Sequence, residues 1–107
     1  MSGLYYYRSK GADNPEACAT LDLLAFTGDN HKRFVTIIDR LIRRRQRGTF
    51  KRSVALKELG SFVGGFVAAH RRGNKSLPPP SKHDKALIAE ALLEGQWHSI
   101  LKHIQKK

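Results

Sequence analysis

Residues 31–47 read HKRFVTIIDRLIRRRQR, and this stretch decides the fold class of the chain. Plotted at about 100° per residue, its large apolar side chains fall within one arc of ~160°, the pattern of an amphipathic helix. They are Phe34, Val35, Ile37, Ile38, Leu41 and Ile42. The opposite arc carries Lys32, Arg33, Arg40, Arg43, Arg44 and Arg47. We therefore expect a helix over 31–47, capped by Asp29 or Asn30 and ended by Gly48, with its apolar face in a core.

The flanking segments carry the same period. Asn14-Pro15-Glu16 combines an N-cap residue, a proline and an acid, which predicts a helix that starts there and stops by Gly28. Apolar residues at helical spacing predict a third helix over 53–72, although glycine inside a helix is unfavourable by about 1 kcal/mol relative to alanine. Its glycines are Gly60, Gly64 and Gly65. The first two are four residues apart, which predicts a close approach by another helix.

After a proline-containing loop at 73–80, Ser81 is expected to cap a fourth helix that reaches about Glu94. This segment is apolar around most of its girth, so we expect it to be the most central helix. Gly95 is expected to end it, and a short final helix is predicted from Trp97, Ile100, Leu101 and Ile104. Residues 1–13 show no helical period. The predicted fold is all-α: a single domain of four to five helices over 14–107, with an irregular N-terminal arm over 1–13.

The charge of the chain is concentrated in one region. The formal net charge is +11, and residues 31–52 alone hold nine basic side chains and one acid, Asp39. Residues 1–30 hold two basic and four acidic side chains, a net of −2. Because focused positive charge attracts polyanions, the sequence predicts a binding surface for nucleic acid, or else for an acidic protein surface.

The candidate binding residues are those of the arginine run and a second basic pair. They are Arg40, Arg43, Arg44, Arg45, Arg47, Lys51 and Arg52, followed by Arg71 and Arg72. Guanidinium groups grip phosphates through paired hydrogen bonds, so several on one helix face predict phosphate contacts with little sequence specificity. The alternative is a solvated face with an Asp39–Arg43 pair. Arg71 and Arg72 alternatively complement the negative end of their helix.

Two further features leave alternatives open. Arg45 falls inside the apolar arc, so the helix ends before it, its stem packs on the core, or it reaches into a groove. Tyr5, Tyr6, Tyr7 and Phe50 are candidates for stacking on bases if they lie beside the basic residues. The simpler expectation for the tyrosines is that they pack the arm onto the domain.

Other functional classes have no support in the residues. Cys18 stands alone, the histidines lack ligand spacing, and no nucleotide-binding or nucleophile motif is present, so we expect no metal, no cofactor and no enzymatic activity. No apolar run reaches the ~18 residues that span a bilayer. The first ten residues lack the apolar core of a signal peptide, which predicts a cytoplasmic protein with no membrane partner.

The order of these features resembles that of short helical proteins of bacteriophages and mobile elements. The resemblance covers roughly residues 35–105 and is carried by Arg40-Leu41, Arg47-Gly48-Thr49-Phe50, Ala55, Val63, Ala68-Ala69 and the late aromatic Trp97. It implies a bacterial host cytoplasm, and an inhibitor that docks on a host protein or ribonucleoprotein as the alternative function. This chain departs from that pattern in its heavier arginine load and in Pro78-Pro79-Pro80, and the resemblance assigns no site residues.

Overall fold

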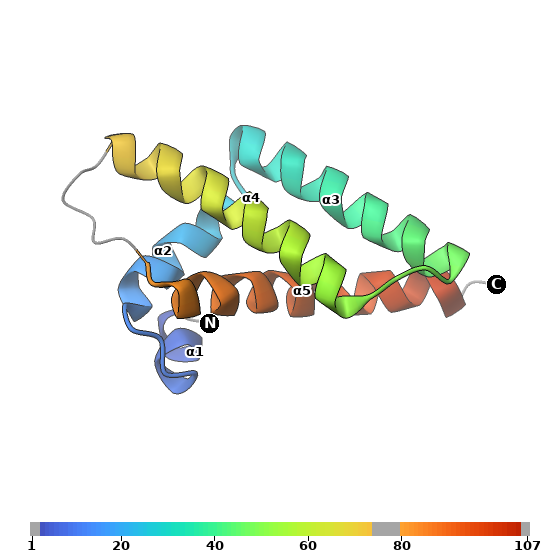
Figure 1. Cartoon of the computed structure of the whole chain (residues 1–107), viewed down its shortest axis with the longest axis horizontal. Helices are drawn as coiled ribbons and strands as arrows, with labels where there is room; N and C mark the ends of the chain where they lie inside the picture. Colours follow the sequence, from blue (N-terminus) through green and yellow to red (C-terminus); the bar gives the residue numbers. More distant parts are fainter. Residues whose placement is uncertain (1–2, 74–79, 106–107) are drawn as a thin grey trace.

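The computed structural model describes residues 3–73 and 80–105, and all regular structure within them is helical (Figure 1). The helices are α1 (Gly3–Ser9), α2 (Pro15–Leu24), α3 (Gly28–Arg47), α4 (Arg52–Gly73) and α5 (Lys82–Gln105). This confirms the predicted all-α fold of four to five helices. The predicted loop over 73–80 lies almost wholly outside the described residues.

The arginine-rich helix forms as its period requires. Phe34, Ile38 and Leu41 are buried, and Gly48 ends α3 with a left-handed φ of 78°, a conformation that glycine adopts without strain. The helix starts earlier than predicted, at Gly28. Thr27 is the residue before it, and the Thr27 carbonyl accepts a hydrogen bond from the His31 N–H at 3.1 Å. The predicted caps, Asp29 and Asn30, therefore lie inside the first turn.

α5 is the helix around which the others pack. It contacts α2, α3 and α4, as predicted for the most apolar segment, and it buries Leu87, Ile88, Ala89, Leu92 and Leu93. The predicted break at Gly95 is wrong, because α5 runs through Gly95 without a positive φ. A glycine ends a helix only where the chain turns left-handed, and here the helix continues instead. The side chains of Trp97 and of the residues after it lie outside the described set.

Figure 1 shows α3 and α4 as an antiparallel pair that lies across α5, with α1 and α2 packed at the amino end of α5. The glycines of α4 do not serve this packing. A Cβ atom built at Gly60, Gly64 or Gly65 would meet nothing within 4 Å. The predicted close helix approach at Gly60 and Gly64 is therefore wrong within the described chain.

The prediction of an irregular arm over 1–13 is also corrected, because Gly3–Ser9 forms α1. Tyr7 is fully buried, and its hydroxyl donates to Asp22 Oδ2 at 2.8 Å. Burial and this hydrogen bond raise the pKa of Tyr7. Tyr6 packs edge-on against Tyr7, whereas Tyr5 is exposed. Tyr7 and Tyr6 therefore attach the arm to the domain, whereas Tyr5 does not. The segment is helical because α2 packs against one of its faces.

A single carboxyl group joins the amino ends of α2 and α5. Asp84 is fully buried, and its oxygens accept hydrogen bonds from the backbone N–H groups of Asp13 at 2.7 Å and Asn14 at 3.0 Å. Ser81 caps α5 as predicted, since its hydroxyl accepts from the Asp84 N–H at 3.1 Å. Asn14 likewise caps α2 by accepting from the Ala17 N–H. Two helix starts, each with a positive dipole end, thus converge on one buried acid.

Replacing Asp84 with alanine removes the acceptor for the backbone N–H groups of Asp13 and Asn14, which are partly buried and then lack that partner. We expect the free energy of unfolding to fall by about 3 kcal/mol, because orphaned buried donors are costly. Thermal unfolding followed by circular dichroism measures this, with a loss of at least ~10 °C in Tm expected for a chain of this size. The control is Asp39→Ala, which removes an exposed acid from α3. Similar midpoints for the two variants would contradict the role of Asp84.

The Cys18 thiol beside this junction predicts a loss of stability in alkali. Burial, together with the nearby charges of Asp84 and Asp22, raises the pKa of Cys18 to about 12. The folded state therefore keeps the thiol proton that the unfolded state releases from about pH 9, and stability falls as pH rises from there towards 12.

The measurement compares wild type with Cys18→Ala under reducing conditions by urea denaturation. The stability difference between them should shift by about 1 kcal/mol against wild type from pH 8 to pH 10. A difference that stays constant over this range would show that the thiol ionises equally in both states.

Candidate nucleic-acid interface

The helical period directs the arginines of α3 to three different surroundings. Arg40 and Arg44 lie on the side that faces α4, Arg43 and Arg47 are exposed, and Arg45 follows the buried line of Leu41. The sequence run is continuous, but the surface that it makes is not.

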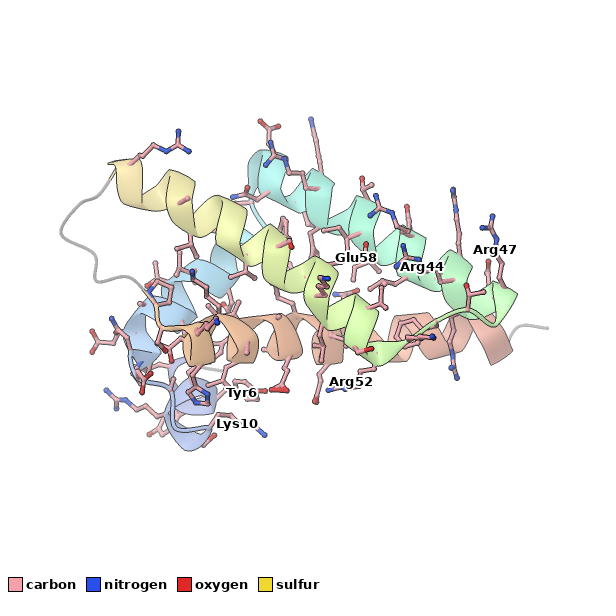
Figure 2. The ribbon with its side chains drawn as sticks, in the orientation of Figure 1. Tyr6, Lys10, Arg44, Arg47, Arg52 and Glu58 are labelled. Atoms are coloured by element: carbon pink, nitrogen blue, oxygen red, sulfur yellow. The ribbon has the colours of Figure 1, made fainter. Side chains whose placement is uncertain are left out.

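Glu58 of α4 binds two of the predicted residues. Its Oε1 accepts a hydrogen bond from Arg40 at 2.8 Å, and its Oε2 is paired with Arg44. Figure 2 shows Glu58 and Arg44 next to each other between α3 and α4, with Arg47 farther along at the carboxyl end of α3. The Glu58 side chain is only 20% exposed, so this bridge is partly shielded from solvent. Arg40 and Arg44 therefore link α3 to α4 within the chain itself.

Sequence reasoning missed Glu58, although a signal was present. Glu58 is the only acidic residue between Asp39 and Asp84 in the sequence. Because α3 and α4 pack antiparallel, it faces the arginine-rich part of α3. One carboxylate between two guanidinium groups offsets part of the repulsion that the run would otherwise create.

The structure rules out one of the alternatives for Arg45, namely that the helix ends before it. The helix continues past it to Arg47, and its guanidinium lies 5.9 Å from the centre of the Phe50 ring. Its stem packs on the core, and its Nε is buried without a hydrogen-bond partner among the described residues. Arg45 therefore packs against Phe50 of the α3–α4 link, and its role as a phosphate ligand stays a prediction.

The remaining basic residues of the run differ in whether they form an ion pair within the described chain. Arg52 pairs with Glu94 at 3.7 Å, but both side chains are exposed, so the pair is weak. Arg43, Arg47 and Lys51 are exposed and form no ion pair within the described part of the chain. The Asp39–Arg43 pair of the solvated-face alternative is not formed. Three unpaired cations thus lie together where α3 ends and the link to α4 begins.

The second basic pair is separate from this cluster. Arg72 is exposed near the carboxyl end of α4, and the side chain of Arg71 lies outside the described residues. Since α3 and α4 are antiparallel, that end of α4 lies far from Arg47 (Figure 1). Arg72 therefore extends the positive surface but does not join the cluster at the end of α3.

The aromatic candidates do not form a stacking surface beside the cluster. Tyr6 lies near Lys10, whose ammonium is 5.6 Å from its ring, and Figure 2 shows both below α5 and well away from Arg47. Phe50 is half-buried beneath Arg45. Tyr6 and Phe50 are therefore engaged within the fold, whereas Tyr5 is exposed and stays a candidate for base stacking.

A groove of about 630 Å³ runs between α3 and α4. Its floor holds apolar side chains, and its rim holds cations and Glu58. The lining residues that matter here are Ile37, Val54, Phe62, Gly65, Arg33, Arg40, Lys57 and Glu58. None of the apolar ones is predicted from the sequence to be part of a site, and Ile37 is assigned to the apolar face of its helix.

The described residues contain neither a metal-ligand cluster nor a membrane-spanning helix. No group of three potential metal ligands occurs among them, and no helix in this part is long and apolar enough to cross a membrane. Comparisons with protein families, curated proteins and solved structures found no match for the chain. The resemblance to phage proteins stays a prediction.

Replacing Glu58 with glutamine leaves Arg40 and Arg44 side by side without their shared carboxylate. We expect the free energy of unfolding to fall by about 1 kcal/mol, because the bridge is partly shielded and joins two helices. Chemical denaturation at low salt gives the value, and added salt should reduce it. Glu94→Gln, which removes only an exposed pair, serves as the control and should have less than half the effect. Equal losses in the two variants would mean that Glu58 makes no special contribution.

Proposed function

We propose that this chain is a small nucleic-acid-binding protein that contacts phosphates through the end of α3 and the link to α4. The observation that carries the proposal is the cluster of Arg43, Arg47 and Lys51, three exposed cations without an ion pair in the described structure. Like charges held close together on a helix end destabilise it in isolation, and phosphates relieve that repulsion.

The surrounding charge supports the same partner. Residues 28–73, which span α3, the link and α4, hold twelve basic side chains and three acids. This gives the α3–α4 layer a positive potential that steers polyanions towards the cluster. Arg52 and Arg72 add further exposed cations on the same layer. Arg40 and Arg44 contribute less than the sequence predicts, because Glu58 holds them.

Sequence specificity is expected to be low. Phosphate contacts fix a protein on nucleic acid but carry no base information, and the three cluster residues are a lysine and two arginines on a helix end. Arginine and lysine at the carboxyl end of a helix also complement its dipole. That structural role accounts for one or two cations in the last turn, and α3 carries Arg44, Arg45 and Arg47 there in addition to Lys51 in the link.

The test is a triple substitution, Arg43→Gln, Arg47→Gln and Lys51→Gln, measured by fluorescence anisotropy on a labelled oligonucleotide. If each side chain neutralises about one phosphate, the log–log salt slope should fall by about three units and affinity at low salt should drop by at least about tenfold. Circular dichroism and Tm should be unchanged, because the three side chains are exposed.

The matched control removes the same charge elsewhere, by Arg8→Gln, Lys10→Gln and Lys82→Gln near the α1 end. It should keep most of the affinity and most of the salt slope. If both triple variants weaken binding equally, net charge rather than the cluster is responsible. If wild type does not bind even at low salt, the proposed function is wrong.

A further inference from the structure

The groove between α3 and α4 has an apolar floor that the proposed phosphate contacts do not use. Val54 is 40% exposed there, and Ile37 and Phe62 are half-buried beside it. Sugars and phosphates gain little from covering aliphatic surface, whereas apolar side chains of another protein gain from it. The volume of about 630 Å³ accommodates several such side chains in a row.

The backbone of α4 is also open to a close neighbour along this groove. Gly65 lines the groove, with Ser61 one turn before it, and Gly64 is adjacent. Glycine inside a helix is unfavourable by about 1 kcal/mol relative to alanine. A Cβ atom at Gly64 or Gly65 would meet nothing within 4 Å, so packing within the described chain does not require either glycine. The absence of side chains there leaves room for another helix to lie close to α4.

The charge around the groove selects among possible occupants. Arg33, Arg40 and Lys57 stand on its rim against a single acid, Glu58, which is already paired with Arg40 and Arg44. A second copy of this chain that docked groove to groove would bring its own cationic rim against these cations. A partner with acidic side chains complements the cationic rim of the groove. If it also has an apolar face, that face covers the apolar floor.

We propose that the α3–α4 groove is a docking site for an acidic amphipathic helix of a partner protein. Apolar side chains of that helix at positions i, i+3 or i+4 and i+7 lie on Ile37, Val54 and Phe62. Its carboxylates lie against Arg33 and Lys57, the groove cations that Glu58 does not hold. The helix crosses α4 where Ser61 and Gly65 leave its backbone uncovered. This site is separate from the phosphate-binding cluster and does not depend on it.

The experiment uses the full chain and a fluorescein-labelled synthetic peptide of about 18 residues, five helical turns, with leucines on one face and glutamates elsewhere. A control peptide has the same composition in an order that forms no apolar face. Fluorescence anisotropy at physiological salt should show the amphipathic peptide bound at least about tenfold more tightly than the control.

Three variants locate the site. Val54→Asp places a charge on the floor, and Gly65→Gln fills the gap over α4 while favouring the helix. Each should weaken peptide binding by at least about tenfold. Val35→Asp is the matched control, because Val35 is 43% exposed and does not line the groove. It should bind as wild type does. Gly65→Gln tests the site even if Val54→Asp lowers the stability of the fold.

The proposed function and this inference fail separately. The triple variant Arg43→Gln, Arg47→Gln and Lys51→Gln should lose oligonucleotide binding and keep most of its affinity for the peptide. Equal affinity for the two peptides, or equal binding by Val54→Asp, Gly65→Gln and Val35→Asp, overturns the docking site. A loss of oligonucleotide rather than peptide binding in Val54→Asp also overturns it, because nucleic acid then occupies the groove.

Discussion

The buried carboxyl group of Asp84 is the interaction that fixes α2, and with it α1, to the start of α5. It accepts hydrogen bonds from the start of α2 while it sits in the first turn of α5, next to its cap, Ser81. It is the only charged side chain buried in the described part of the chain. A buried acid is tolerable when donors and helix dipoles surround it, and here two helix starts provide both. Because α2 is fixed in this way, α1 can bury Tyr7 against it.

This junction also determines how charge is distributed over the molecule. The acids Asp13, Asp22 and Asp84 gather where α1, α2 and the start of α5 meet. The α3–α4 layer, which lies across α5, carries most of the positive charge (Figure 1). A chain whose cations were spread evenly would be soluble but would focus no field on one face. Here the fold separates the two signs, and the separation leaves one layer suited to anionic partners.

Within that layer, Glu58 divides the arginines by role. Arg40 and Arg44 tie α3 to α4 through it, and Arg45 holds the link by packing on Phe50. Arg43, Arg47 and Lys51 are left exposed beyond the bridge. The Glu58 carboxylate thus binds two arginines into the contact between α3 and α4. It also lines the groove between these helices. The phosphate-binding cluster and the groove are consequences of the same helix pairing.

The sequence by itself determined the helices whose signals are local. The apolar period of residues 31–47, the caps at Asn14 and Ser81 and the left-handed Gly48 each act within a few residues, so each was predictable. The continuation of α5 through Gly95 was not predictable from local signals, because the packing of a long helix outweighs the unfavourable helix propensity of one residue. The helical arm was missed for the same reason: α1 is stabilised by the burial of Tyr7 and not by its own composition. Only the tertiary structure decided which arginines of α3 form an ion pair with Glu58 and which do not. That pairing depends on how α3 and α4 pack together, which the local sequence pattern of α3 does not determine.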